Sequence, residues 1–110
     1  VEEIADYVRA SDISAFIVNG SVTAVRLINR LEQFGLRVPR DLEIVGVGDL
    51  EVLSLCRPAL SCINYDTAAL MEQAVELLIR YRESGPGQVA LVPSGYIARN
   101  STRSTLEKPI

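Results

Sequence analysis

Polar residues and glycines follow two short apolar runs of the chain, and these are the residues whose chemistry could hold a small molecule. Asparagine, serine and aspartate donate or accept hydrogen bonds, whereas glycine allows a tight turn and a close approach of the backbone. The first group follows the apolar run at residues 15–18, and the second closes the run at residues 42–47. We take as candidate ligand-binding residues Asn19, Gly20, Ser21, Gly48 and Asp49.

The sequence offers no catalytic or metal-binding constellation. It contains no histidine, which is the commonest general base and a frequent metal ligand. Cys56 and Cys62 are too few for a disulfide framework or a metal site, and they are typical of ordinary buried or partly buried thiols. No glycine-rich, phosphate-binding loop with a lysine occurs. We therefore expect a binding protein that is not an enzyme and that needs no metal and no cofactor.

Composition and charge narrow the class of protein further. The 110 residues are enough for one domain or part of one, and 48% apolar with 23% charged residues is typical of a soluble globular domain. A net charge of −3 without a basic run argues against direct binding of DNA or of an anionic membrane by this segment. No apolar run approaches the roughly 20 residues that span a bilayer. Residues 1–3 do not resemble a signal peptide, so we expect a cytoplasmic protein.

The apolar periodicity predicts helices and strands that alternate along the chain. Helical spacing predicts helices at residues 2–10, 22–34 and 66–83, with a short helix within residues 50–57. Short apolar runs predict strands at residues 15–18, 42–47, 60–64, 88–92 and 96–99. Ser21 is the expected N-cap of the second helix, Gly35 ends that helix, and Asp66 or Thr67 caps the long one. The polar tail from Ser101 on is expected to fray.

This order of elements is typical of an α/β fold with a mostly parallel sheet and helices on both faces. Ligands of such sheets bind beyond the carboxyl ends of the strands. The candidate binding residues all follow a predicted strand, so the fold would bring them to one edge of the sheet.

Three segments resemble, in their order and spacing, the signatures of LacI/GalR-type transcriptional regulators. They read Gly-Leu-x-Val-Pro-x-Asp-Leu-x-Ile-Val-Gly at 35–46, Pro-Ala-Leu-Ser-Cys-Ile at 58–63 and Tyr-Ile-Ala-Arg-Asn-Ser-Thr at 96–102. The resemblance spans about residues 12–103. It implies the C-terminal part of an effector-binding domain with a fold like that of the type I periplasmic binding proteins.

The resemblance also implies how the chain is divided and what the whole protein does. Residues 1–62 would form the C-terminal subdomain, residues 63–92 a helix and a strand of the other subdomain, and residues 93–103 a return strand. The implied function is sensing of a small-molecule effector and dimerisation, with operator DNA bound through an N-terminal module that is absent from this chain. A solute-binding protein of the same fold is the alternative.

Two glycines depart from the family pattern at the strand ends. The family usually carries a polar pair such as Asn-Asp where Gly20 and Ser21 align, and an aspartate where Gly48 aligns. Those family side chains bond sugar hydroxyls or nucleobase edges. The missing side chains argue against the usual sugar or nucleobase effector of the family. Two interpretations stay open: the glycines make room for a different or bulkier effector, or they are only turn residues.

A homodimer contact is expected on the second helix and on the segment after the second strand. Val22 and Val25 widen the apolar surface of the helix beyond one face, and Leu50 and Leu53 belong to a second apolar segment. The long helix carries another apolar stripe, which its own sheet or a second copy of the chain could cover, and we expect the second copy. The stripe consists of Leu70, Ala74, Leu77, Leu78 and Tyr81.

Overall fold

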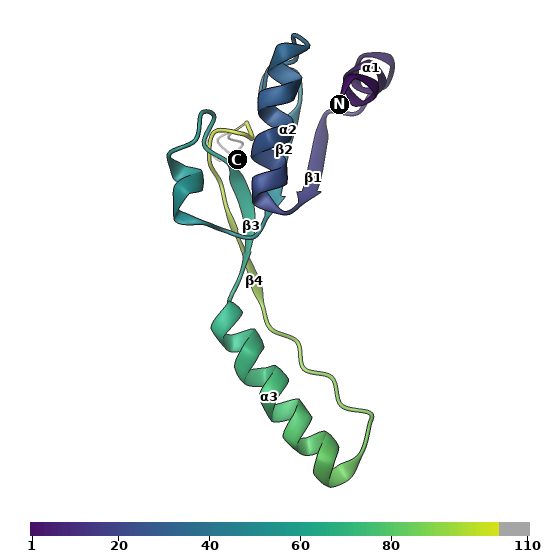
Figure 1. Ribbon diagram of the computed structural model, residues 1–110, viewed down its shortest axis with the longest axis vertical. Coiled ribbons are helices and arrows are strands. Elements are labelled where there is room, and N and C mark those ends of the chain that lie inside the picture. The colour runs from purple at the N-terminus through teal and green to yellow at the C-terminus, as the bar shows by residue number, and fades with distance from the viewer. Residues whose placement is uncertain (104–110) are drawn as a thin grey trace, which may run out of the picture. The chain divides into compact units, whose positions relative to one another are not determined.

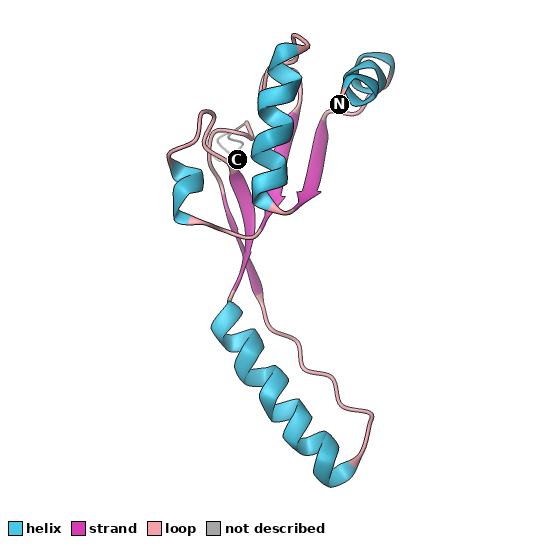
Figure 2. Cartoon of the chain, viewed as in Figure 1, coloured by secondary structure: helices cyan, strands magenta, loops and turns pink. Residues whose placement is uncertain are grey.

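A computed structural model describes residues 1–103 of the chain. Helices and strands alternate along it, as expected for an α/β protein (Figures 1 and 2). The elements are α1 (Glu2–Ala10), β1 (Ala15–Asn19), α2 (Ser21–Gln33), β2 (Glu43–Val47), the 3-10 helix η1 (Glu51–Ser54), β3 (Ser61–Tyr65), α3 (Thr67–Ser84) and β4 (Ser94–Ile97). The α/β class predicted from the sequence is therefore confirmed.

The four strands form one sheet in the order β1-β2-β3-β4. β1 pairs with β2, and β2 with β3, both in the parallel sense. Asn19 lies opposite Val47, and Val47 lies opposite Ile63, so the carboxyl ends of the three strands meet at the same edge. The mostly parallel sheet is confirmed, and its register brings the residues that follow β1 and β2 together.

The core lies between one face of the sheet and the first two helices. Along β2 the side chains alternate between buried and half-buried, with Ile44 and Gly46 on the buried face, as period-two geometry requires. On the edge strand β1 the alternate residues face solvent, and Ile17 is 70% exposed. The buried apolar cluster comprises Ala5, Val8, Ala24, Ile28, Leu31, Leu36, Val38, Leu42, Ile44, Leu53 and Leu60.

The end of α2 is fixed by local chemistry that the sequence had indicated. Gly35 has a φ of +82°, in the left-handed region that glycine enters without strain. Its N–H donates to the carbonyl of Glu32, and the N–H of Leu36 donates to the carbonyl of Leu31. This is the Schellman pattern, and Leu31 and Leu36 join the same core cluster behind it.

Two predicted strands differ from the structure. No strand forms at residues 88–92, although the composition favoured one, and Val89 and Leu91 are 85% and 91% exposed. A strand needs a neighbour to accept and donate its backbone hydrogen bonds. No such neighbour lies along these residues within the described part of the chain. The last strand, β4, begins and ends two residues earlier than predicted, which leaves Arg99 in the turn that follows it.

The chain divides into two compact units, Val1–Asn64 with the segment from Tyr96 on, and Tyr65–Gly95. The second unit consists mainly of α3, which Asp66 caps by accepting a hydrogen bond from the N–H of Ala69 at 3.0 Å, as predicted. No residue of α3 is buried, and Leu70 and Leu78 are 39% and 63% exposed. The stripe is thus uncovered in the single chain, and the expectation that a second copy covers it stays a prediction.

Candidate functional site

Gly20 and Ser21 form the turn from β1 into α2, but their roles differ from the sequence prediction. Gly20, with a φ of +94°, is the N-cap residue, and Ser21 is already the first residue of the helix. The prediction that Ser21 caps α2 is wrong, because its buried hydroxyl points across to β2 instead. It donates to the carbonyl oxygens of Val47, at 3.1 Å, and of Gly48.

The close approach of Ser21 to β2 depends on a missing side chain at Gly46. A Cβ atom at that position would lie 2.8 Å from Cδ2 of Leu60 and 3.2 Å from Oγ of Ser21. Both distances are too short for a carbon at van der Waals contact. Gly46 therefore lets the first turn of α2 pack directly on the strand, and it belongs to the framework of the site.

Gly48 continues from β2 with a φ of +95°, in the left-handed region. Its N–H donates to the carbonyl of Ile63 at 2.8 Å, which holds the turn against β3. A residue with a side chain would be strained in this conformation. An aspartate at position 48, as in the family pattern, would thus need a different backbone at this turn.

Asp49 is held by partners from two other segments. Its Oδ1 accepts from Nη1 of Arg99 at 3.0 Å and from the thiol of Cys62 at 3.3 Å. The hydrogen bond from Arg99 is the main cause that lowers the pKa of the Asp49 carboxyl below its ordinary value. Burial, reinforced by Asp49, raises the pKa of the Cys62 thiol, so that thiol stays protonated and donates.

Arg99 contacts this site but was not among the binding residues predicted from the sequence. Its place in the third family-like segment was visible, but nothing in the local sequence pairs it with a carboxylate 50 positions earlier. The pairing depends on the sheet order. Only β3 lies between β2 and β4, so the residue Asp49 after β2 and the residue Arg99 after β4 can meet.

Asn19 ends β1, directly opposite Val47 in the register of the sheet. Its side chain is exposed and has no hydrogen-bond partner among residues 1–103. Of the five candidates, all lie at the ends of β1 and β2, but the polar groups of Ser21 and Asp49 are already engaged. The amide of Asn19 is therefore the side chain that remains free to meet a ligand.

The segment after β4 is fixed between β2 and β3. Ser101 is fully buried; its Oγ donates to the carbonyl of Ile44 at 2.6 Å and accepts from the N–H of Ser61 at 2.7 Å. The hydroxyl of Ser61 in turn bonds the hydroxyl of Thr102. The expectation that the chain frays from Ser101 on is wrong for residues 101–103, and residues 104–110 lie outside the described part.

The four candidate dimer residues fall into different environments. Val22 and Leu50 are about half exposed, at 52% and 49%. Val25 is half-buried and packs against the core. Leu53 is 1% exposed and belongs to the core itself, so it cannot contact a partner. Leu53 is the one buried residue of η1, and it packs in the same core cluster as Leu60.

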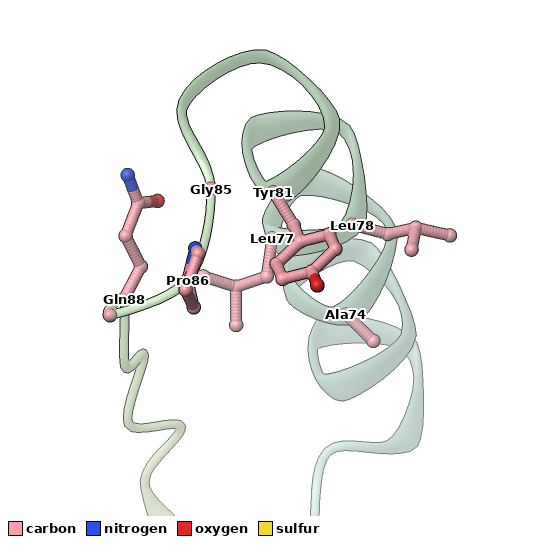
Figure 3. A pocket seen from close by; sticks show the side chains of 8 residues that line it. Ala74, Leu77, Leu78, Tyr81, Gly85, Pro86 and Gln88 are labelled. Atoms are coloured by element: carbon pink, nitrogen blue, oxygen red, sulfur yellow. The ribbon is translucent and has the colours of Figure 1, made fainter.

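Among the hollows of the described residues, two lie apart from the engaged polar groups of Ser21 and Asp49 and have a largely apolar lining. One, of about 620 Å³, is lined almost wholly by apolar atoms of α1, of β1 up to Asn19, and of Leu27 on α2. The other, of about 340 Å³, lies between the end of α3 and the following loop. Figure 3 shows Leu77 beside Pro86 there, while Leu78 points away from the loop.

Within residues 1–103, no helix is long and apolar enough to cross a membrane. No three acidic or cysteine side chains of the same stretch gather closely enough to hold a metal ion.

Comparison with known proteins matches residues 2–102 to the model of the periplasmic binding protein-like domain. The chain is 31% identical over 99 residues to the HTH-type transcriptional repressor PurR of Haemophilus influenzae strain PittEE, covering 84% of this chain and 29% of that protein. It is 40% identical over 57 residues to the ribose operon repressor of Haemophilus influenzae Rd, covering 52% of this chain and 17% of that protein. The chain thus spans less than a third of the length of either relative.

Among solved structures, the lac repressor dimer bound to operator and an anti-inducer superposes with a TM-score of 0.73 at 23% identity, over 94% of this chain and 37% of that one. A LacI-type transcription regulator from Bifidobacterium animalis gives a TM-score of 0.66 at 25% identity, over 83% of this chain and 33% of that one. These likenesses agree with the parallel sheet and the helices described above.

Proposed function

The chain belongs to the periplasmic binding protein-like domain family, and we propose that it is the effector-sensing and dimerisation part of a LacI-like, DNA-binding transcriptional regulator. The observation that carries this proposal is the match of residues 2–102 together with the repressors among the relatives. Operator DNA would be bound by another part of the regulator, since this chain has a net charge of −3 and no basic run. The regulator would act in the cytoplasm.

The effector site of this regulator would lie at the carboxyl ends of β1 and β2. Asn19 would bond the effector directly, because its amide is exposed and has no partner among the described residues. Gly20 and Gly48 would leave space beside it, and their N–H groups and carbonyls can also bond a ligand. The role of this edge is binding and not catalysis, so we propose that the chain is not an enzyme.

The division of the chain supports a regulator with two subdomains. We propose that residues 1–62 and 93–103 belong to the C-terminal subdomain and that residues 63–92 belong to the other. The exposed apolar side of α3 and the unpaired residues 88–92 are what a helix and a strand show when the rest of their own subdomain is absent.

Although Gly20 and Gly48 lack the family side chains that bond sugar hydroxyls, we propose an uncharged, hydroxyl-bearing small molecule as the effector class. One relative is named a ribose operon repressor, and a solved structure of the same fold was obtained with D-xylulofuranose. Hydroxyl groups match an amide such as that of Asn19, which both donates and accepts.

Calorimetric titration of the protein with D-ribose and with D-xylulose tests the site. We expect saturable binding of a pentose that falls at least tenfold in Asn19→Ala. Asn29→Ala changes an exposed amide on α2 and serves as the matched control that should bind as the unmodified protein does. Equal binding by both variants would remove Asn19 from the site, and no pentose binding at all would overturn the proposed effector class.

A further inference from the structure

We infer that Arg99 is a positioning residue for the candidate effector site, which it serves by holding the carboxylate of Asp49 in place. The inference rests on the proposed function of this edge of the sheet. Nη1 of Arg99 donates to Oδ1 of Asp49 at 3.0 Å and to the carbonyl of Leu60 at 2.9 Å, and it lies 3.4 Å from Sγ of Cys62. One nitrogen thus joins the turn after β2 to the start of β3.

The surroundings make this contact stronger than an ordinary surface ion pair. The side chains of Arg99 and Asp49 are 16% and 24% exposed. Partly buried charges are screened less by water and salt than exposed ones, whose pairing contributes little. The chain offers a comparison in Arg103 and Glu43, which form an ion pair at 3.2 Å with 58% of the arginine side chain exposed.

Hydrogen bonds hold the backbone of Arg99 in place, and this limits where its guanidinium can lie. The N–H of Arg99 donates to Oγ of Ser61 at 2.8 Å, and its carbonyl lies 3.1 Å from the same hydroxyl. Two residues later, Ser101 is anchored to β2 and β3. The position of Asp49 is therefore determined by the segment that follows β4 as well as by its own turn.

The pairing with Arg99 determines which ligand groups the Asp49 carboxylate can bind. Its charge is balanced by Arg99, so the edge does not present a bare carboxylate that would attract cations. The lone pairs that Arg99 and Cys62 leave unused can accept hydrogen bonds from uncharged hydroxyl or amide groups. An effector that moves Asp49 would also move Arg99, and with it the turn that ends β4.

Carbon-detected NMR titration of the Asp49 carboxyl tests the positioning role. The other groups that face this carboxyl are the Cys62 thiol and the backbone N–H of Leu50. In Arg99→Gln the pKa of Asp49 should rise toward its ordinary value, and the amide signals of residues 48–50 should shift. Arg99→Lys should keep the pKa low, because a single charged donor suffices at this contact.

Arg103→Gln is the matched control, since it removes the exposed ion pair at the other end of β2 and should leave the Asp49 pKa unchanged. An unchanged Asp49 pKa in Arg99→Gln would overturn the inference, as would a rise in Arg99→Lys equal to that in Arg99→Gln. If Arg99→Gln does not fold, Arg99→Lys is compared with the unmodified protein instead. A raised Asp49 pKa in the lysine variant would contradict the inference.

Titration of the same variants with D-ribose separates this inference from the proposed function. Arg99→Gln should bind D-ribose at least fivefold more weakly than Arg103→Gln does, with recovery in Arg99→Lys. If the unmodified protein binds no D-ribose while the Asp49 pKa responds as expected, the proposed effector class fails and the positioning of Asp49 stands. If it binds D-ribose equally in all variants, the positioning role fails and the proposed function stands.

Discussion

At the scale of single residues, the two cysteines make the clearest contrast in the molecule. Cys62 is fully buried between Asp49 and Arg99, whereas Cys56 is half-buried and only bonds the carbonyl of Val52. Because the thiolate is the reactive form and burial raises the pKa of Cys62, we expect a thiol reagent to modify Cys56 well before Cys62. Mass spectrometry after brief labelling checks this, with denatured protein as the control in which both react.

The carboxyl of Asp41 should make the stability of the fold depend on pH in the acid range. Its carboxylate accepts from the side chain of Arg40 and from the N–H of Arg37, and these bonds lower its pKa to about 2. Because the folded-state pKa lies below the unfolded value, the stabilisation is fully present above about pH 4 and is lost as the pH falls toward about 2.

Carboxyl NMR should show Asp41 titrating near this low value, and Arg40→Gln should raise it. Arg30→Gln removes an arginine that bonds Gln33 instead and should leave the Asp41 titration unchanged. An Asp41 pKa that does not respond to Arg40→Gln would assign the depression to the N–H of Arg37 alone.

At the scale of elements, the segment after β4 stabilises the sheet through one hydroxyl. Ser101→Ala would leave the N–H of Ser61 and the carbonyl of Ile44 without these partners in the core. Unsatisfied buried groups of this kind cost about 1–3 kcal/mol of unfolding free energy. Urea unfolding should show a loss of that size in Ser101→Ala.

Ser54→Ala is the matched control for this measurement. Its hydroxyl bonds the carbonyl of Glu51 on the exposed side of the 3-10 helix, so the loss should stay within about 0.5 kcal/mol. Equal losses in the two variants would mean that the hydroxyl of Ser101 does not stabilise the sheet.

The helix α2 and the segment around η1 carry the proposed dimer contact. Val22→Glu places a charge on an exposed apolar residue and should yield monomers that keep their fold. Leu53→Glu would bury a charge in the core and should unfold the protein instead.

Light scattering and circular dichroism distinguish the two outcomes. A Val22→Glu protein with the mass of a dimer would exclude this residue from the interface. A folded Leu53→Glu protein would contradict the burial of Leu53 in the core.

At the scale of the whole molecule, the two units should differ in local stability. None of the residues of α3 is buried, whereas α2 contributes Ala24, Ile28 and Leu31 to the core. Helices without buried apolar contacts open at low free-energy cost. We therefore expect the amides of α3 to exchange with solvent faster than those of α2.

Raising the protein concentration extends this hydrogen-exchange experiment. Burying a large apolar side chain is worth about 1.5–3 kcal/mol, so a second copy that covers the stripe should slow exchange in α3. Leu78→Glu should abolish that slowing, and the internal strand β2 provides the reference, because α2 carries the other proposed dimer contact. Exchange in α3 that is as slow as in α2 at every concentration would contradict the exposure described for this helix.

The sequence by itself determined the features that depend on neighbouring residues. Gly35 ends α2 and Asp66 begins α3 because the backbone groups that they satisfy lie only a few residues away. The alternation of apolar runs likewise predicted the α/β class, since each period is a local property.

Only the tertiary structure decided which distant groups meet. The hydroxyl of Ser21 bonds the end of β2 instead of capping its own helix, and Asp49 pairs with Arg99 across 50 positions. Residues 88–92 have the composition of a strand but no neighbour, while Leu53 turns inward from an apolar segment. Strand pairing and burial depend on what lies opposite in space, and a single stretch of sequence does not carry that information.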